Sequence, residues 1–309
     1  MRYLFIILIL LGCGRTKKPR ATINEVDRLK EKVSRYVEYQ KSIADDYGWL
    51  PPKCDGLLFN SLAAVSGFPV DPMKAEENLS GKWQRHPAMD CYTDEKDGSK
   101  SEISRDMIRG LEVYLLKQKD LAALERIKKY GEEHDWVMGA GLLSRTYFTP
   151  VMRWQLDALI KHLSPPALFV WFTEDPEGNS IFTKPGFEGH LHVLKIMLNG
   201  MMYGAISEVE LFILRQYTLD NPSNALYQAL YHKYKDGDQS AAISILFDTS
   251  LFPDSGLPQD SDRYAHYLWQ RDFGDDWRPC TVEGERKCEG VTHAGVDFLL
   301  AAKVAMGEL

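Results

Sequence analysis

The sequence lacks the short motifs that mark several large enzyme classes. It contains no GxSxG segment, no phosphate-cradling loop ending in GKS or GKT, and no GxGxxG segment. A serine nucleophile elbow, a nucleotide-binding loop and a dinucleotide-binding turn each need one of these patterns. Serine hydrolysis, nucleotide binding and dinucleotide redox chemistry are therefore not expected, and no cofactor is predicted.

An excess of basic residues is also missing. The chain has 37 Lys and Arg against 44 Asp and Glu, which gives a formal net charge of −7. No concentrated basic patch follows residue 22, so nucleic acid is not expected as a partner. No long linker rich in Ser, Gly and Pro interrupts the remainder, and residues 23–309 are predicted to form a single domain.

The apolar run at the N-terminus is too short to span a membrane. Leu4–Leu11 follows the cationic start Met1-Arg2-Tyr3, and a spanning helix needs roughly 20 apolar residues. This pattern is typical of a cleaved export signal, which we assign to residues 1–12. An ordinary secretory signal and a buried N-terminal helix are both possible readings of the run.

The segment after the run points to lipidation. Leu10-Leu11-Gly12-Cys13 resembles a bacterial lipobox, and the resemblance implies cleavage before Cys13 and a lipid on its thiol. Gly14, where some lipoproteins carry Asp, implies the outer membrane, with the body facing the periplasm or the cell surface. Residues 13–22 would then be the lipidated cysteine and a flexible tether, through which the membrane is a predicted partner.

Four further cysteines remain, at positions 54, 91, 280 and 288, and none belongs to a CxxC pair. The missing close pair argues against a zinc site. An even number in an exported chain predicts disulfides. A local Cys280–Cys288 bridge would leave Cys54 to pair with Cys91, and buried free thiols are the alternative.

Apolar periodicity predicts an all-α body. The expected helices cover residues 23–46, 54–65, a hairpin at 101–130 that turns near 117–120, 149–163, 189–203, 207–219, 223–234, 239–250, 260–271 and 290–306. Strand signals are few, chiefly Leu168–Thr173.

Two kinds of helix alternate in this pattern. Leu191–Tyr203 and much of Phe298–Met306 are apolar all round and must be buried on every side. Ile23–Asp46 and Asp120–Tyr130 are amphipathic. Inner helices wrapped by outer ones, as a ring or a double layer, satisfy both kinds. A helical solenoid is the alternative.

In this organisation the body resembles the secreted (α/α) toroid enzymes that hydrolyse or eliminate polysaccharides. The resemblance rests on helical hairpins, aromatic-rich loops and acidic residues at helix entrances over residues 46–309. It implies carboxylates acting as acid and base where helix ends meet long loops, aromatic side chains that stack on sugars, and a polysaccharide or glycan as partner.

Asp106 is the first catalytic candidate. It lies in the first turn of its predicted helix, where the helix dipole favours a negative charge. It points away from the main apolar face toward Gly110 and Val113, and burial there would favour the protonated form that a general acid needs. The alternative is a structural acid paired with Arg109 or Arg105.

Further candidates lie near the C-terminus. His293 and Asp297 are four residues apart, so on one helix they would stack as a base and its orienting carboxylate, or as a structural pair. Asp276, in an acidic loop between Trp269 and Trp277, could place a carboxylate beside an aromatic platform or be a solvated turn.

Several side chains are candidates for substrate binding. They are cationic or aromatic residues at helix ends or in loops: Arg105, Trp136, Arg145, Tyr147, Trp269 and Trp277. A metal site is not predicted at Glu188-Gly-His190-Leu-His192, because on a helix only Glu188 and His192 would share a face.

The sequence thus leaves two main hypotheses. One is an exported, lipid-anchored enzyme, a glycoside hydrolase or polysaccharide lyase working by general acid/base catalysis. The other is a non-catalytic lipoprotein that binds glycan or a protein partner in a helical cleft, and a scaffold without a cleft is a third. An enzyme needs two carboxylates, or a carboxylate and His293, within one site.

Overall fold

The computed structural model describes residues 23–51, 56–88, 102–140, 145–164, 187–249, 251–254 and 295–309. Several predictions concern residues outside these ranges. They are the signal segment 1–12, the tether 13–22, Cys13 and the other four cysteines, the strand segment 168–173 and the helix 260–271.

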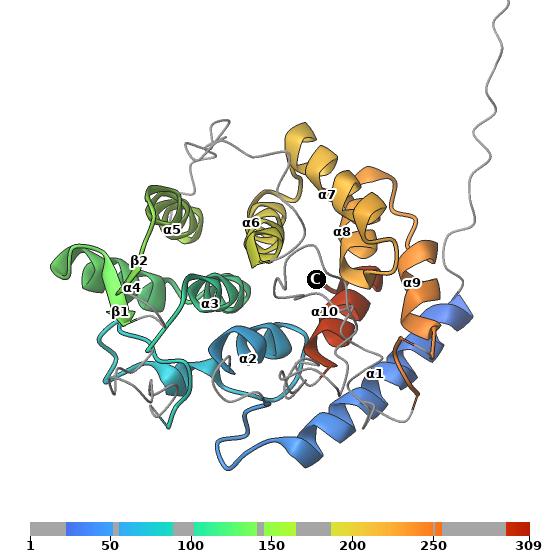
Figure 1. The fold of residues 1–309 in the computed structure, drawn as a ribbon, viewed down its shortest axis with the longest axis horizontal. Coiled ribbons are helices and arrows are strands. Elements are labelled where there is room, and N and C mark those ends of the chain that lie inside the picture. Colours follow the sequence, from blue (N-terminus) through green and yellow to red (C-terminus); the bar gives the residue numbers. More distant parts are fainter. Residues whose placement is uncertain are drawn as a thin grey trace, which may run out of the picture.

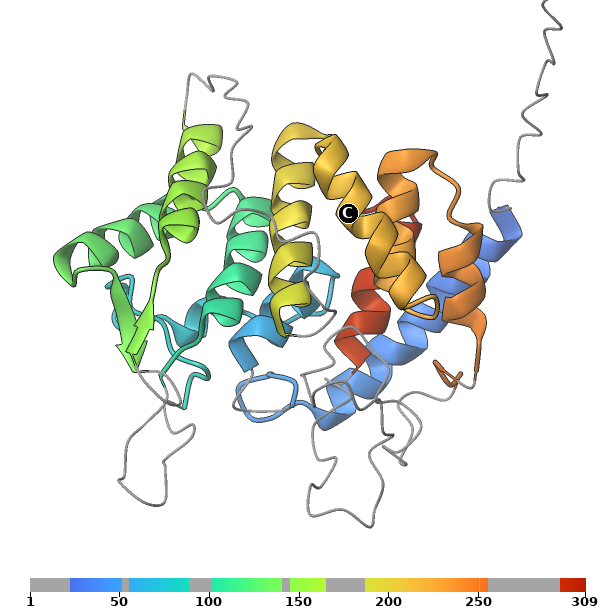
Figure 2. The same ribbon diagram turned by 45° about the horizontal axis from the view of Figure 1, so that its top comes forward.

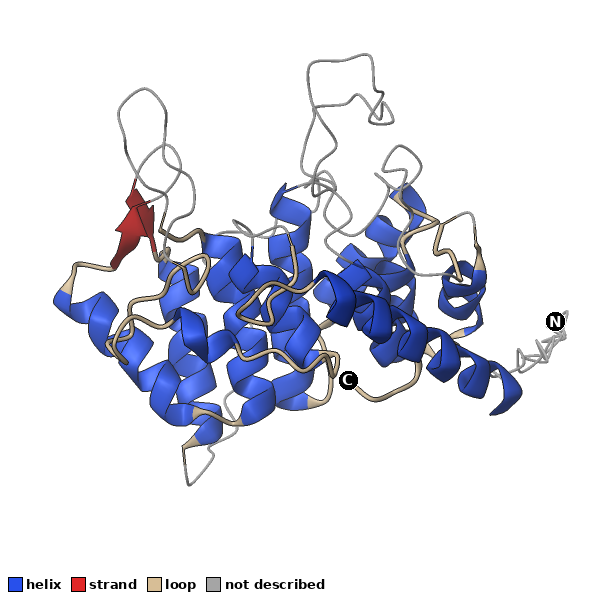
Figure 3. Cartoon of the chain, turned by 90° about the horizontal axis from the view of Figure 1, so that it is seen from below, coloured by secondary structure: helices blue, strands red, loops and turns tan. Residues whose placement is uncertain are grey.

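The described chain is mostly helical, which confirms the all-α class (Figure 1). The helices are α1 (Ile23–Ile43), α2 (Gly56–Val65), the short 3-10 helix η2 (Pro72–Ala75), α3 (Arg105–Gln118), α4 (Leu121–Glu133), α5 (Pro150–Leu163), α6 (Phe187–Tyr203), α7 (Glu208–Asp220), α8 (Ala225–Lys235), α9 (Ser240–Phe247) and α10 (Val296–Ala305). Strands β1 (Val137–Ala140) and β2 (Arg145–Tyr147) pair antiparallel and project from one end of the helical body (Figure 3).

The predicted hairpin of residues 101–130 is present as α3 and α4, which pack against each other. Its turn falls where expected. Lys119 adopts the left-handed conformation, with φ of 58°, and its N–H bonds to the last carbonyls of α3. The carboxylate of Asp120 then accepts the Ala123 N–H at 2.9 Å and caps the start of α4. Local sequence therefore decides both helix ends.

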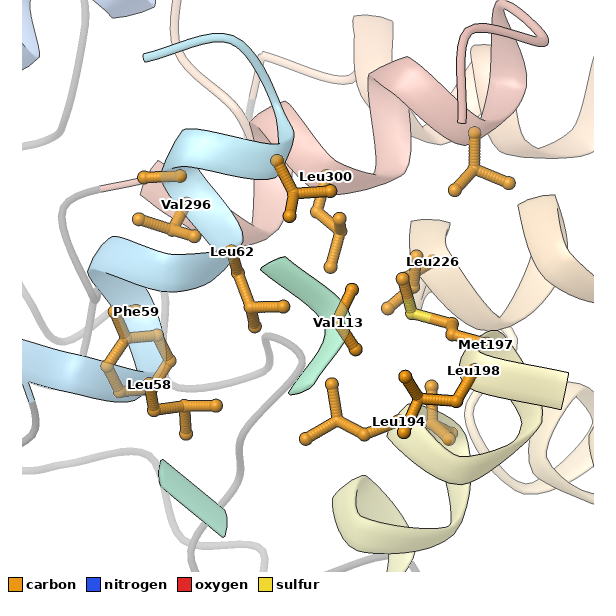
Figure 4. Close-up of a cluster of buried hydrophobic side chains, with 14 of the residues drawn as sticks. Leu58, Phe59, Leu62, Val113, Leu194, Met197, Leu198, Leu226, Val296 and Leu300 are labelled. Atoms are coloured by element: carbon orange, nitrogen blue, oxygen red, sulfur yellow. The ribbon is translucent and has the colours of Figure 1, made fainter. Parts of the chain in front are cut away.

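The core lies between helices that are distant in sequence. α3 packs against α2, α4, α5 and α6, whereas α10 packs against α1, α2, α8 and α9. Figure 4 shows Val113 of α3 among side chains of α2 and α6, with Leu300 of α10 close to Leu62 of α2. Leu194 in α6, and Phe298 and Leu300 in α10, are fully buried. α10 thus lies in the interior, as predicted, whereas α6 is buried on one side and keeps a half-buried face that includes Leu191, Lys195 and Asn199.

Within the part of the chain that the structure describes, no helix combines the length and the apolar character needed to cross a bilayer.

Candidate functional site

The N-terminal ends of α2 and α3 lie side by side. The Arg85 carbonyl accepts the Leu57 N–H of α2 at 2.9 Å, and the Arg85 N–H donates to the Glu102 carbonyl at 2.7 Å. Gly110 permits this approach, because a Cβ there would lie 2.6 Å from Leu58 Cδ1. We call this place the α2–α3 entrance, formed by residues 56–58, 85–86 and 102–106.

The β1–β2 hairpin is attached to the same place. Glu102 and Ala140 exchange two bonds: the Glu102 N–H donates to the Ala140 carbonyl at 2.8 Å, and the Ala140 N–H donates to Glu102 Oε2 at 2.9 Å. Thr146 Oγ1 donates to the Ile103 carbonyl at 2.8 Å. Figure 2 shows the hairpin and the first turn of α3 at the same edge of the molecule.

Two predicted binding residues lie on the attached strand. Arg145 and Tyr147 are two positions apart on β2, so they project from the same face of the strand. Arg145 is exposed, and Tyr147 is 49% exposed. Because Thr146 turns its side chain to Ile103, Arg145 and Tyr147 project together from the opposite face of β2. The exposed guanidinium and phenol ring are thus carried by the strand that is attached to the start of α3, and they point away from it. Arg105, at the start of α3, is also exposed.

Asp106 lies inside the entrance and is only 1% exposed. Ser104, the N-cap residue of α3, makes no capping bond, and its hydroxyl donates to the Asp106 carboxylate instead. Arg109, one of the two expected partners, instead donates from Nη1 to Glu112 Oε2 at 2.7 Å. The structure therefore places a buried carboxylate at the start of α3, held by the preceding hydroxyl.

The Arg109–Glu112 pair is an ion pair inside the fold that sequence reasoning missed. Both side chains are almost completely buried, and within the described part of the chain Glu112 Oε1 has no hydrogen-bond partner. Burial raises the pKa of Glu112, and the charge and hydrogen bond of Arg109 only partly counter that effect. Each charge therefore depends on the other to stay in the interior.

Glu102 lies in a second charged group at the entrance. Lys82 Nζ lies 3.0 Å from Glu102 Oε1 and 3.1 Å from Glu77 Oε2. Partial burial raises the pKa of Glu102, but the bonds from the Ala140 N–H and Lys82 more than offset it and bring the pKa below its usual value. Glu102 is thus a carboxylate held in its charged form.

Trp136, a predicted substrate-binding residue, packs against its own fold and does not present a free ring face for stacking on a sugar. A Cβ on Gly131 would lie 2.5 Å from Trp136 Cε3, which shows how closely the indole lies on α4. Arg153 lies over the indole, with Cζ 4.9 Å from the ring centroid, and Phe148 packs on it at 5.9 Å. The half-buried indole therefore contacts protein on several sides.

Asp297 occupies the first turn of α10 and is 6% exposed. Its Oδ1 accepts the Phe298 N–H at 2.8 Å, and its Oδ2 has no hydrogen-bond partner among the residues that the structure describes. Burial raises its pKa to about 7, against the smaller effect of the backbone N–H bonds. α10 begins at Val296, after a left-handed Gly295, so the described helix starts beyond His293.

Stability should depend on pH through Asp297. In the unfolded chain this carboxyl loses its proton near pH 4, whereas in the fold it keeps the proton to about pH 7. The folded state thus binds more protons in this window, and stability falls as pH rises through it. We expect the free energy of unfolding to drop by roughly 3 kcal/mol from about pH 5 to about pH 8 because of this group.

Urea unfolding at several pH values checks this expectation. Asp297→Asn should remove the drop, whereas Asp220→Asn, at an exposed position in α7, should leave it unchanged. An identical pH dependence in the native protein and in Asp297→Asn would contradict the assignment.

Four predicted site residues, His293, Asp276, Trp269 and Trp277, lie outside the described residues. At the segment 188–192, where no metal site was predicted, the side chains of Glu188 and His190 also lie outside the described residues. His192 Nδ1 lies 3.3 Å from Tyr217 Oη. Among the side chains that the structure describes, no group of three or more His, Cys, Asp and Glu could hold a metal ion.

Sequence reasoning also missed a histidine–carboxylate pair next to the entrance. His86 Nε2 lies 2.7 Å from Asp45 Oδ2. The two residues are 41 positions apart, and no local pattern joins them. In the sequence, only His86 itself, near Trp83, could have drawn attention to this pair, because no motif surrounds it.

A scan against protein-family models finds no match to this chain, and searches of curated proteins and of solved structures find none either. The function therefore has to be argued from the residues and their geometry.

Proposed function

We propose that this chain is the body of an exported, lipid-anchored protein that acts on a polysaccharide by general acid/base catalysis at the α2–α3 entrance. The observation that supports it best is the attachment of the β1–β2 hairpin to the start of α3 through Thr146 and Ile103. This contact attaches the strand that carries the exposed pair Arg145 and Tyr147 to the segment that leads from the charged Glu102 into the buried Asp106.

In this proposal the carboxylates have different tasks. Asp106 is the proton donor to the leaving glycosidic oxygen, because its buried carboxyl lies at the start of α3, next to the attached hairpin. Glu102, with its lowered pKa, is charged at neutral pH and suits a base or a group that stabilises developing positive charge. Asp297 lies on α10 and is not one of the residues of the entrance. It stays a separate catalytic candidate, since a pKa of about 7 suits proton donation near neutrality. Asp276 and His293 stay predictions.

The proposal extends to the arrangement of the helices and to the N-terminus. A double layer or (α/α) toroid is supported by α10, which contacts α1 and α2 as well as α8 and α9. Lipidation of Cys13 and anchoring in the bacterial outer membrane are supported by the lipobox-like segment at residues 10–13.

A non-catalytic glycan-binding lipoprotein is the second candidate. Both carboxylate oxygens of Glu102 are already engaged, one by Lys82 and the other by the Ala140 N–H. Asp106 is enclosed, whereas Arg145 and Tyr147 are exposed. A protein that only binds a glycan needs the exposed side chains and no free acid.

Product formation separates the two candidates. The purified chain would be incubated with a panel of polysaccharides and with peptidoglycan, and reducing ends and unsaturated products would be measured. We expect product with the native chain, and a loss of at least about 100-fold in Asp106→Asn, the contribution typical of a general acid.

Asp120→Asn is the matched control, because asparagine replaces aspartate at a helix N-cap with little loss. It should form product like the native chain. Undiminished product from Asp106→Asn would rule out the assigned acid, and no product from the native chain on any polymer would favour the binding protein.

A further inference from the structure

The loop that follows α1 is closed into a compact turn by one aspartate. Asp45 Oδ1 accepts the N–H groups of Tyr47 and Trp49, both at 2.9 Å. The Asp45 N–H donates to the Trp49 carbonyl at 2.9 Å, and the Gly48 N–H donates to the Asp45 carbonyl at 2.8 Å. Lys74 Nζ donates to the Tyr47 carbonyl at 3.0 Å. These hydrogen bonds fix the backbone before and after Tyr47, and so fix the position of its side chain.

A buried histidine holds the other oxygen of the same carboxylate. His86 is 1% exposed, and its Nε2 lies 2.7 Å from Asp45 Oδ2. Its Nδ1 lies 3.1 Å from the Ala88 nitrogen and accepts that N–H. Because Nδ1 is the acceptor, Nε2 carries the proton and donates it to the carboxylate. The buried imidazole therefore orients the Asp45 carboxylate from the protein side, while 36% of the Asp45 side chain remains exposed.

The aromatic side chains around the imidazole differ in exposure. Trp49 and Tyr47 both stand edge-on to the His86 ring, at 5.3 Å and 5.4 Å between centroids. Trp49 is buried, and its Nε1 donates to the Asp71 carbonyl at 3.3 Å. Tyr47 is 41% exposed. We call Asp45 and Tyr47, with His86 and Trp49 beneath them, the Tyr47 shelf.

The shelf adjoins the α2–α3 entrance. His86 directly follows Arg85, whose backbone bonds to both Leu57 and Glu102. A Cβ on Gly56, the first residue of α2, would lie 3.0 Å from Trp49 Cε3 and 3.1 Å from the Arg85 carbonyl oxygen. A polymer lying at the entrance therefore has the shelf next to it.

We propose that the Tyr47 shelf is a binding subsite for a neutral sugar ring. The proposal rests on the proposed function, because it assigns a part of the same glycan. A phenol ring offers an apolar face to the C–H side of a sugar. Asp45 Oδ1 already accepts two backbone N–H groups, but Oδ2 accepts one bond from His86 and can use its second lone pair for a sugar hydroxyl. Asp45 and the neighbouring Asp46 are acidic and the nearby Lys74 is basic. Acidic side chains therefore outnumber basic ones beside Tyr47, which disfavours an acidic sugar here.

Direct binding tests the shelf without any need for turnover. Cellohexaose, chitohexaose and hexagalacturonate would be titrated into the full chain by isothermal calorimetry. We expect one of the two neutral oligomers to bind, with affinity at least about tenfold weaker in Tyr47→Ala and nearly unchanged in Tyr47→Phe, which keeps the ring. Asp45→Asn should also weaken binding, because the neutral amide is a poorer acceptor than the carboxylate.

Phe212→Ala is the matched control, since Phe212 is 44% exposed on α7 and belongs to no part of the shelf. It should bind like the native chain. Equal affinity in Tyr47→Ala and the native chain would overturn the proposal, and so would a native chain that binds neither neutral oligomer.

The two proposals fail in different ways. If the native chain forms product and Tyr47→Ala binds with unchanged affinity, the proposed sugar subsite is ruled out and the catalytic proposal stands. Tyr47-dependent binding without product on any polymer would remove catalysis and leave the shelf as part of a glycan-binding protein.

Discussion

Gly81→Ala is expected to lower the free energy of unfolding by at least about 4 kcal/mol, which is large for a single methyl group. Gly81 has a φ of +82°, and a Cβ there would lie 2.1 Å from the Arg126 carbonyl oxygen and 2.5 Å from its carbon. Both atoms belong to the backbone of α4, so no side chain can move aside. To accommodate the methyl group, the loop around Gly81 would have to move away from α4.

That movement would also disturb an ion pair. Glu76 Oε1 accepts the Gly81 N–H at 3.0 Å. Arg126 donates to both oxygens of the same carboxylate, at 2.7 Å from Nε and 2.6 Å from Nη2. Glu76 is completely buried at its side chain. A displaced loop therefore weakens the bonds of a buried charge, which adds to the steric cost.

Gly204→Ala separates backbone strain from the steric contact. Gly204 also has a positive φ, of +71°, but a Cβ there would meet nothing within 4 Å. Only the left-handed conformation opposes alanine at this position, with a cost of about 1 kcal/mol. Urea unfolding of both variants measures the difference. Equal losses would show that contact with α4 is not the cause at Gly81.

Arg109→Met is expected to cost about 3–5 kcal/mol, because it leaves the Glu112 carboxylate buried without its counter-charge. Glu112 Oε2 would lose its 2.7 Å bond to Arg109, and Glu112 Oε1 already has no partner among the described residues. Methionine keeps much of the apolar volume of the arginine stem, so a loss of packing contributes little. The cost is largely that of an unpaired charge.

The double variant Arg109→Met and Glu112→Leu provides the test. With both charges removed, the interior holds two apolar side chains of similar size, and most of the lost stability should return. Chemical denaturation of both single variants and of the double variant gives the coupling energy between the two positions. A double variant no more stable than Arg109→Met would show that packing and not charge governs this site.

Local sequence determined most of the secondary structure. The hairpin of residues 101–130 was predicted from its apolar spacing, and its turn lies where Lys119 and Asp120 end one helix and begin the next. Of the two helices that were predicted to be buried on every side, α10 is buried so, whereas α6 keeps a half-buried face. These features could be predicted because each depends on residues within a few positions of one another.

Some local expectations were less accurate. α10 begins at Val296, six residues after the predicted start at residue 290. Arg109 was an expected partner of Asp106, but one turn further along α3 it bonds Glu112. Residues three or four apart on a helix offer several partners, and tertiary packing selects among them.

The sequence by itself determined an acidic, helical chain. It also predicted an export signal at the N-terminus and singled out Asp106, Arg145 and Tyr147 as site candidates. Only the tertiary structure joined β2, which carries Arg145 and Tyr147, to the start of α3, through bonds such as the one between Thr146 and Ile103, 43 positions apart.

The same holds for His86 and Asp45, 41 positions apart, and for Arg126 and Glu76, 50 positions apart. Periodicity reports which face of a helix is buried but carries no information about which distant segment covers it. Tertiary packing alone therefore decided which residues meet at the entrance, at the Tyr47 shelf and around Gly81.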